Sequence, residues 1–357
     1  MAHRHLTDLP ALSVHTDADI FHTNQSLTDK KTTLSQISDY VWTEEFDLIV
    51  DSDAKLDLWC QAVAGEYKRV LIRAGTWTAS ALSPTAGVLV NLTAAGTVYV
   101  RAEKDAVVEY SGAYAGIMYG FWRTALLADE WGEKFENIKI VLTNTNQTAA
   151  AFRNCSNLID CQAFVVAGTI AYSYYTCKRL RHCYGSAEGV TGCQAYNACW
   201  YLDNCKGMAE DTGTSAAVAF NGCFYLLHCR GEVLGTGGND YAYNSCYDLV
   251  NCYGVTSEGV NSVAFFSCLR MSQCEGYSGG NTANDVVGML ECSGVVSCRA
   301  QGVNSGAGNG YGFKGCTKMQ QNAPAGGSKT ATYNISYADT ATANPCADTA
   351  AGGYNNP

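Results

Sequence analysis

The feature that most constrains this chain is a cysteine repeat. Two cysteines separated by five residues recur seven times, and successive units begin 22 to 24 residues apart. The pairs are Cys155/Cys161, Cys177/Cys183, Cys199/Cys205, Cys223/Cys229, Cys246/Cys252, Cys268/Cys274 and Cys292/Cys298, and Cys316 begins an eighth unit with Asn322 in its second position. A fixed period of this length is the signature of a solenoid, in which each unit stacks on its neighbours.

Other columns of the repeat also keep their residue type. An aromatic residue or Met stands three residues before each first cysteine: Phe152, Tyr174, Tyr196, Phe220, Tyr243, Phe265, Met289 and Phe313. Leu, Met or Val stands three residues after it, and Gly or Ala stands two residues after the second cysteine. One leucine per unit is too few for a leucine-rich repeat, and the unit lacks the 3.6-residue stripe of a helix.

We therefore predict an all-β, single-stranded, right-handed parallel β-helix with 22–24 residues per coil. Neighbouring coils would lie about 4.8 Å apart, the ordinary spacing of paired strands. Equivalent residues then lie above one another, so the aromatic, cysteine and leucine columns should each form an inward ladder.

Composition excludes several classes of protein. The chain has 357 residues, 47% of them hydrophobic and 16% charged, with a formal net charge of −10. An acidic chain of this kind lacks the basic face that nucleic-acid binding requires, and no apolar run is long enough for a membrane span. No phosphate-binding loop, nucleophile elbow or HExxH motif is present, so we expect no cofactor.

The state of the 18 cysteines has alternative interpretations. The N-terminus has no apolar stretch behind a basic start, which favours a chain made in the reducing cytosol with free, buried thiols. The alternative is a disulfide scaffold, which would need tight turns between partners. Zinc binding by Cys177, His182, Cys183 and His228 is disfavoured by the spacing, and the histidines share a column with Asp, Asn, Gln and Ser. We predict no metal.

Four regions precede, form and follow the solenoid. Residues 46–67 should hold a capping helix, Ala54–Ala64, that begins after Asp51-Ser52-Asp53, ends at Gly65 and buries Leu56, Trp59, Cys60 and Val63. Residues 68–321 should form the β-helix, with weaker rungs at 70–72, 88–92, 98–100, 107–110 and 138–142 and the cysteine repeats over 151–322. Residues 322–357 should form a C-terminal cap or tail. Residues 1–45 look separate, with a turn, a short strand and a helix around Leu34–Val41.

Several short motifs resemble phage tail proteins. Leu9-Pro10-Ala11, Asp17-Ala18-Asp19-Ile20-Phe21, Asn24-Gln25 and Lys30-Lys31-Thr32-Thr33-Leu34-Ser35-Gln36-Ile37 resemble the N-terminal attachment segment of tail-fibre and tailspike proteins. Residues 70–78, Val70-Leu71-Ile72-Arg73-Ala74-Gly75-Thr76-Trp77-Thr78, are similar to the first rung of a pectate-lyase-type β-helix, and the repeat resembles that of the same superfamily, with Cys where Ser or Asn is commoner. Ala347-Asp348-Thr349-Ala350-Ala351-Gly352-Gly353-Tyr354-Asn355 is similar to tail-protein endings. The resemblance implies a trimeric, virion-borne adhesin, in some cases with glycan-cleaving activity.

Aromatic residues also recur at positions that a ligand could reach. Trp200, Phe224 and Tyr247 directly follow the first cysteine on three consecutive coils, and Tyr201 and Tyr225 follow two of them. If strand alternation holds, one of the two columns points outward. An outward column of stacked rings is a candidate sugar-binding surface or trimer contact, and the alternative is that the turn folds these rings partly into the core.

Acidic residues give candidates for catalysis. Glu188 and Glu210 share an offset five residues after the second cysteine, so they should stack on neighbouring coils about 5 Å apart. Asp211 adjoins them and Glu258 lies nearby in offset. Glycosidases need two carboxyl groups about 5–10 Å apart, but ordinary solvated acids are the simpler interpretation. Asn239-Asp240 and Asn284-Asp285 follow glycine pairs and are expected to be turn residues rather than calcium ligands.

Three functional hypotheses follow. The first is a tail-fibre or tailspike-like adhesive protein of a virion, made in the host cytoplasm and assembled as a homotrimer. It would bind a host-surface polysaccharide or receptor, and residues 1–45 would bind other tail or virion proteins. The second is a glycan depolymerase, a lyase or glycosidase, on the same fold. The third is an extracellular, cell-surface or filament β-helix protein with no virion role.

Overall fold

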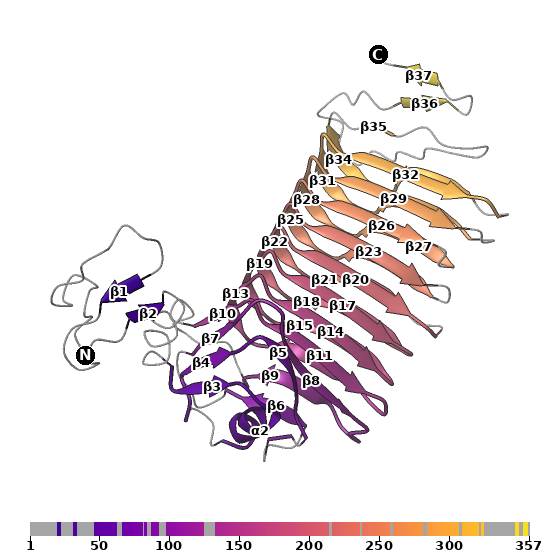
Figure 1. Cartoon of the computed structure of the whole chain (residues 1–357). Coiled ribbons are helices and arrows are strands. Elements are labelled where there is room, and N and C mark those ends of the chain that lie inside the picture. Colours follow the sequence, from indigo (N-terminus) through magenta and orange to yellow (C-terminus); the bar gives the residue numbers. More distant parts are fainter. Residues whose placement is uncertain are drawn as a thin grey trace.

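The computed structural model describes most of the chain from residue 46 to residue 320 (Figure 1). The described ranges are 46–62, 66–80, 82–83, 87–92, 98–124, 133–213, 216–235, 238–257, 260–280, 284–306 and 309–320. Beyond them it describes the backbone of five short strands: β1 (Ile20–His22), β2 (Lys31–Thr33), β35 (Ala323–Pro324), β36 (Ala347–Thr349) and β37 (Gly353–Asn355). Strands β1 and β2 pair antiparallel, and β2 lies where the short N-terminal strand is expected.

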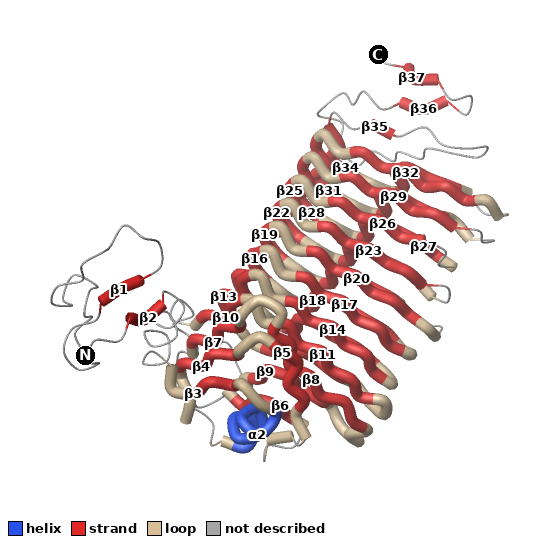
Figure 2. The backbone as a smooth tube through the Cα atoms, viewed as in Figure 1, coloured by secondary structure: helices blue, strands red, loops and turns tan. Residues whose placement is uncertain are grey.

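The chain winds into a parallel β-solenoid with three sheets along its length (Figures 1 and 2). Sheet I has twelve strands: β3 (Leu48–Val50), β4 (Arg69–Ile72), β7 (Tyr99–Ala102), β10 (Lys134–Glu136), β13 (Ser156–Ile159), β16 (Lys178–Arg181), β19 (Trp200–Asp203), β22 (Phe224–Leu227), β25 (Tyr247–Val250), β28 (Leu269–Ser272), β31 (Ser293–Val296) and β34 (Thr317–Gln320). Sheet II has eleven: β5 (Gly75–Thr78), β8 (Ala106–Gly112), β11 (Lys139–Asn144), β14 (Gln162–Ala167), β17 (Tyr184–Gly189), β20 (Lys206–Asp211), β23 (Arg230–Gly235), β26 (Tyr253–Ser257), β29 (Glu275–Gly280), β32 (Arg299–Asn304) and β35. Sheet III has ten: β6 (Val88–Asn91), β9 (Met118–Trp122), β12 (Ala149–Arg153), β15 (Ile170–Tyr175), β18 (Gly192–Asn197), β21 (Ala217–Asn221), β24 (Asn239–Asn244), β27 (Asn261–Phe266), β30 (Val286–Leu290) and β33 (Gly310–Lys314). The predicted all-β parallel helix is confirmed, as are strands at the weaker rungs.

Each cysteine of the repeat stands at a corner between two sheets. Only two residues join sheet III to sheet I, and two join sheet I to sheet II; in both places a residue with positive φ precedes the cysteine. A third left-handed residue lies inside each strand of sheet I from β13 to β34. The three columns are Asn154, Thr176, Ala198, Gly222, Ser245, Ser267, Glu291 and Gly315; Asn157, Arg179, Tyr201, Tyr225, Asp248, Arg270, Gly294 and Lys318; and Asp160, His182, Asn204, His228, Asn251, Gln273 and Ser297. The left-handed conformation accounts for the enrichment of short polar residues there.

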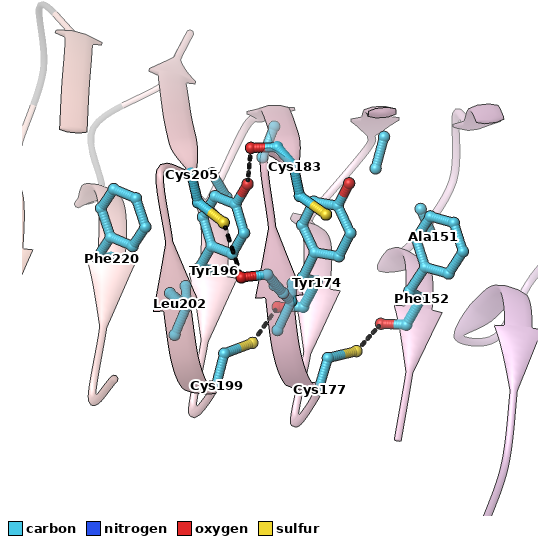
Figure 3. Packing of buried hydrophobic residues seen from close by; sticks show 14 of the residues in the cluster. Ala151, Phe152, Tyr174, Cys177, Cys183, Tyr196, Cys199, Leu202, Cys205 and Phe220 are labelled. Atoms are coloured by element: carbon cyan, nitrogen blue, oxygen red, sulfur yellow. Dashed lines mark hydrogen bonds between the residues drawn. The ribbon is translucent and has the colours of Figure 1, made fainter. Parts of the chain in front are cut away.

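The seventeen cysteines that the structure describes are buried, and none of them is in a disulfide. At the corners each thiol lies near two main-chain carbonyls. Cys199 Sγ is 3.5 Å from Tyr174 O on the preceding coil (Figure 3) and 3.4 Å from Asn197 O. Cys183 Sγ lies 3.4 Å from both Leu158 O and Arg181 O. A thiol therefore fills the corner as a small apolar group whose weak donor faces a carbonyl.

The aromatic column is a stacked ladder in the core (Figure 3). Ring centroids lie 5.3 Å apart for Phe152 and Tyr174, 4.8 Å for Tyr174 and Tyr196, and 4.7 Å for Tyr196 and Phe220. The small residues after the second cysteine have a steric cause, because a Cβ at Gly207 would lie 3.1 Å from the Tyr196 ring. The predicted inward ladders of aromatics, cysteines and leucines are confirmed.

The helix α2 (Asp53–Gln61) packs against the first coils. Ser52 caps it by accepting a hydrogen bond from Lys55 N, as the sequence predicts, and Leu56, Trp59 and Cys60 are buried. The predicted C-terminal end is wrong. The helix ends at Gln61 because Ala62 adopts an extended conformation and donates its N–H to Trp59 O. Val63 and Gly65, and the helix expected around Leu34–Val41, lie outside the described residues.

Candidate functional site

Five aromatic side chains form a surface on sheet I that we call the aromatic platform: Trp200, Tyr201, Phe224, Tyr225 and Tyr247. Trp200 and Phe224 have ring centroids 6.0 Å apart, and Phe224 and Tyr247 are 4.8 Å apart. Tyr201 and Tyr225 stack at 4.9 Å with an interplanar angle of 4° and are 51% and 48% exposed. Lys178 Nζ lies 5.6 Å from the Trp200 ring centroid and extends the platform by one coil.

Both columns of the platform reach the surface, because the strand alternation that would turn one of them inward does not hold here. Tyr201 and Tyr225 have φ of 59° and 58°. The left-handed residue interrupts the alternation of the strand, so Tyr201 and the residue before it, Trp200, both lie outside, while the residue after it, Leu202, lies inside. The platform therefore has a half-buried row and an exposed row side by side.

The conformation of the two tyrosines is itself informative. A left-handed residue that is not glycine costs roughly 1–2 kcal/mol, and Asn and Asp adopt it most readily. Elsewhere this column holds Asn157, Asp248 and Gly294, together with the long basic residues Arg179, Arg270 and Lys318, so the two tyrosines are its aromatic members. Two bulky, solvent-exposed tyrosines in consecutive coils stabilise no core that would offset the strain. Strained, exposed residues of this kind concentrate at functional sites.

The candidate acids separate into two environments. Glu188 and Glu210 are Cα partners in adjacent strands of sheet II, and their side chains lie on the outer face, half-buried and exposed respectively. The exposed Val166 and Leu234 flank them in the same column. The carboxylates thus stand on neighbouring coils, at a spacing set by strand pairing of about 4.8 Å.

Asp211 does not join Glu188 and Glu210 on that face. It is only 3% exposed, because alternation turns the residue after Glu210 inward. Its Oδ1 accepts a hydrogen bond from Gly213 N at 2.9 Å. Glu258 lies outside the described residues.

The two histidines of the cysteine repeat lie at the surface. His182 Nδ1 is 3.3 Å from Asp160 Oδ1, and His228 Nδ1 is 3.6 Å from Asp203 Oδ1, with all four side chains about half exposed. The neighbouring cysteines Cys183 and Cys229 face the core. Within the described ranges no three His, Cys, Asp or Glu side chains gather in a way that could hold a metal ion.

Sheet III carries a second outward surface that the sequence reasoning missed. At one end, Tyr172 stacks on Tyr175 at 5.1 Å, and the Arg153 guanidinium lies 5.3 Å from the Tyr175 ring and 4.7 Å from that of Tyr119. Further along, a ladder of amides links consecutive coils through the side chains of Gln194, Asn197, Asn221 and Asn244. Their signal in the sequence is a tyrosine or amide that recurs two and five residues before the first cysteine.

A groove follows the amide ladder on the same face, with a volume of about 480 Å³. It is lined by Asn239, Tyr241, Asn261, Val263, Asn284, Asp285, Val287, Leu290 and Lys314. The Tyr241 ring stacks on Phe266 at 5.0 Å. Lys314 Nζ bonds Asp285 Oδ2 at 2.6 Å, so the polar wall is an ion pair beside an aromatic surface.

Comparison with known proteins gives no family for the chain: no family model, no curated protein and no solved structure matches it. The search for membrane-crossing helices, over the part of the chain that the structure describes, finds none that is long and apolar enough. The functional argument therefore depends on the geometry of the solenoid's surfaces.

Proposed function

We propose that this chain is an adhesive β-solenoid that binds a surface polysaccharide through the aromatic platform. The single observation that carries the proposal is the stacked pair Tyr201 and Tyr225, exposed and held in a left-handed conformation. Sugar rings present apolar C–H faces that pack on aromatic rings, and a row of rings on successive coils suits a chain of repeating sugars. The outward amides of sheet III would add hydrogen-bonding groups of the kind that hydroxyls require.

The test is a double substitution that preserves the fold. Tyr201→Asn and Tyr225→Asn place in this column the residue that the structure already uses at Asn157, so stability should be unchanged or higher. An array of bacterial surface polysaccharides, probed with the full chain, should show binding by the wild type and at least a tenfold loss in the double variant. Arg270→Asn, in the same column two coils beyond Tyr225, is the matched control. Unchanged binding in the double variant would remove the platform from the function.

The setting we propose is a phage tail. Support comes from the resemblance of residues 9–41 to tail attachment segments and from the solenoid itself, a common shape for tail adhesins. In this proposal residues 1–45 bind another virion protein and three copies of the chain assemble. Native mass spectrometry of the full chain should then give a trimer. A monomer at micromolar concentration would argue for the cell-surface or filament alternative.

One observation favours glycan cleavage as a second candidate function. Glu188 and Glu210 are register partners on the outer face of sheet II, at a separation compatible with the two carboxyl groups of a glycosidase. Incubation of the full chain with any polysaccharide that it binds should then release new reducing ends or unsaturated sugars. Glu188→Gln and Glu210→Gln should each abolish that release and leave binding intact. Product formation that survives both substitutions would exclude these acids.

A further inference from the structure

Three strands of sheet II end in an acidic or amide residue that faces inward: Asn144 in β11, Asp211 in β20 and Asn304 in β32. All three are buried. Each accepts, through Oδ1, a hydrogen bond from the backbone N–H two residues later. The solenoid thus builds the same turn three times.

The second side-chain atom distinguishes Asp211 from the two asparagines. Asn144 Nδ2 donates to Gly116 O and Thr148 O, both at 3.2 Å, and Asn304 Nδ2 donates to Asn284 O at 2.6 Å. At Asp211 the corresponding atom is Oδ2, which accepts and cannot donate unless protonated. This oxygen is buried and has no hydrogen-bond partner. A position that donates to carbonyls in two turns is occupied in the third by a carboxylate oxygen.

A second carboxylate fills the equivalent space on the next coil. Gly235 is the register partner of Asp211 on the following coil, and a Cβ at Gly235 would lie 2.7 Å from Asp240 Oδ2. The Asp240 carboxyl therefore fills the space that a side chain at Gly235 would take. Asp240 is fully buried, its Oδ1 accepts from Ala217 N at 3.3 Å, and its Oδ2 has no partner. Asp240 is thus part of strand β24 and the core, not a turn residue as the sequence suggested.

The surroundings offer these acids little compensation. Burial, opposed by the Ala217 hydrogen bond and reinforced by the Asp211 charge, raises the pKa of Asp240 to about 7. Burial, followed by the charges of Asp211 and Asp240, raises the pKa of the nearby Cys193 thiol. A buried pair of carboxylates with two unpartnered oxygens is costly unless a positive charge or a proton lies between them.

We propose that Asp211 and Asp240 bind a hard metal cation, Ca²⁺ in the first instance, between two consecutive coils of the solenoid. The cation would satisfy both unpartnered Oδ2 atoms at once. Calcium takes ~6–8 oxygen ligands, including main-chain carbonyls and water as well as carboxylates. In the equivalent turns, main-chain carbonyls accept from Asn144 and Asn304; in this proposal carbonyls of that kind, with water, complete the coordination at Asp211. The site does not depend on the adhesive function proposed above.

The experiment uses the full chain, stripped with EDTA and transferred to metal-free buffer at pH 7.5. Titration with CaCl₂ in a calorimeter should show one saturable site per chain, and thermal unfolding should shift upward with CaCl₂ concentration. Asp211→Asn supplies the donor that Asn144 and Asn304 use, so it should fold without metal and lose both calcium responses. Asp160→Asn, at an exposed acid on the corner between sheets I and II, should keep both.

Asp240→Asn is the second variant, and it keeps the test decisive if Asp211→Asn fails to fold. It too should lose calcium binding, since one of the two carboxylates is gone. Calcium binding retained in a folded Asp211→Asn or Asp240→Asn variant would overturn the proposal. So would a wild type that shows no response to Ca²⁺ but loses stability between pH 5 and pH 8, with Asp240→Asn abolishing that loss. A shared proton would then occupy the position, with Asp211, Cys193 and Tyr241 as the neighbouring titratable groups.

Discussion

Removal of one ring from the aromatic ladder gives the sharpest test of how the solenoid is held together. Tyr196 is fully buried, and its ring stacks between those of Tyr174 at 4.8 Å and Phe220 at 4.7 Å. Its hydroxyl donates to Cys183 O at 2.7 Å and lies 3.2 Å from Lys206 O. Tyr196→Ala removes both stacked contacts and the hydrogen bond together.

The cost can be worked out from these contacts. Truncation of a buried aromatic residue to alanine costs about 3–5 kcal/mol. The hydrogen bond adds about 0.5–1.5 kcal/mol. We therefore expect Tyr196→Ala to lower the free energy of unfolding by about 5 kcal/mol. Tyr196→Phe keeps the ring, and Cys183 O still accepts from Lys206 N at 2.9 Å, so it should cost about 1 kcal/mol.

The repeat provides a matched control on the next coil. Phe220 stacks in the same ladder. Cys205 O, which accepts a hydrogen bond from Arg230 N, is the equivalent on its coil of Cys183 O, so it could also accept one from a tyrosine hydroxyl at position 220. Phe220→Tyr should therefore be neutral or slightly stabilising.

Urea unfolding followed by circular dichroism measures the change, and amide hydrogen exchange locates it. Because a solenoid unit contacts only its neighbours, the loss of protection should centre on the coils around Tyr196. The reasoning fails if Tyr196→Ala costs less than about 2 kcal/mol, because the stacked rings then contribute little. It also fails if Tyr196→Phe costs as much as Tyr196→Ala, since the hydroxyl alone would then carry the effect.

Three further predictions concern the glycine column, a buried ion pair and the thiols, and a fourth concerns pH. Gly207→Ala should cost about 1–3 kcal/mol, because its Cβ would press on the aromatic ladder, and urea unfolding checks it. Arg123 Nη2 and Glu133 Oε1 lie 2.6 Å apart in a fully buried ion pair. Glu133→Gln removes the negative charge beside the guanidinium, so it should lower the free energy of unfolding by about 3–5 kcal/mol in the same urea assay. The described thiols are all buried, so iodoacetamide at pH 8 should leave them unmodified in the native chain and label them after denaturation; rapid native labelling contradicts this. In the metal-free protein, folding raises the pKa of Asp240 from 3.8 to about 7, so the folded state binds more protons than the unfolded state between pH 4 and pH 7. The thermal unfolding midpoint should therefore fall as pH rises from 4 to 7. A midpoint that rises over this range, equally in the wild type and in Asp240→Asn, contradicts this.

The interior of the fold could be predicted from the sequence because the repeat records it directly. In a parallel stack each residue lies on its equivalent in the next coil, so a column that must pack keeps one residue type. Phe152, Tyr174 and Tyr196 could be identified as a ladder on that ground alone. The cap by Ser52 was equally readable, because its signal is local. The end of α2 at Gln61 was not, since no strong stop signal stands there.

The outside of the fold could not be predicted to the same degree, because a period does not reveal where within the unit the chain turns. The columns at His182 and Tyr201 hold such varied residues that their common property, a left-handed backbone, is hidden. That conformation turns two neighbouring aromatic columns outward and leaves alternation valid in sheet II. In sheet II, by contrast, alternation is what separates Asp211 from its neighbour: Glu210 faces outward and Asp211 lies in the core.

The candidate sites therefore lie where this chain departs from the rule of its own columns. Every coil meets the same demands for packing and for turning, so a residue that those demands explain needs no further cause. Tyr201 and Tyr225 are the aromatic members of a left-handed column that elsewhere holds Asn, Asp, Gly, Arg or Lys, and about half of each side chain is exposed. Asp211 occupies the turn position at which Asn144 and Asn304, on other coils, donate hydrogen bonds to main-chain carbonyls, whereas its own Oδ2 has no hydrogen-bond partner. In a solenoid the other coils serve as internal controls, and packing within the chain does not by itself account for the residues at these positions; for that reason we propose ligands there.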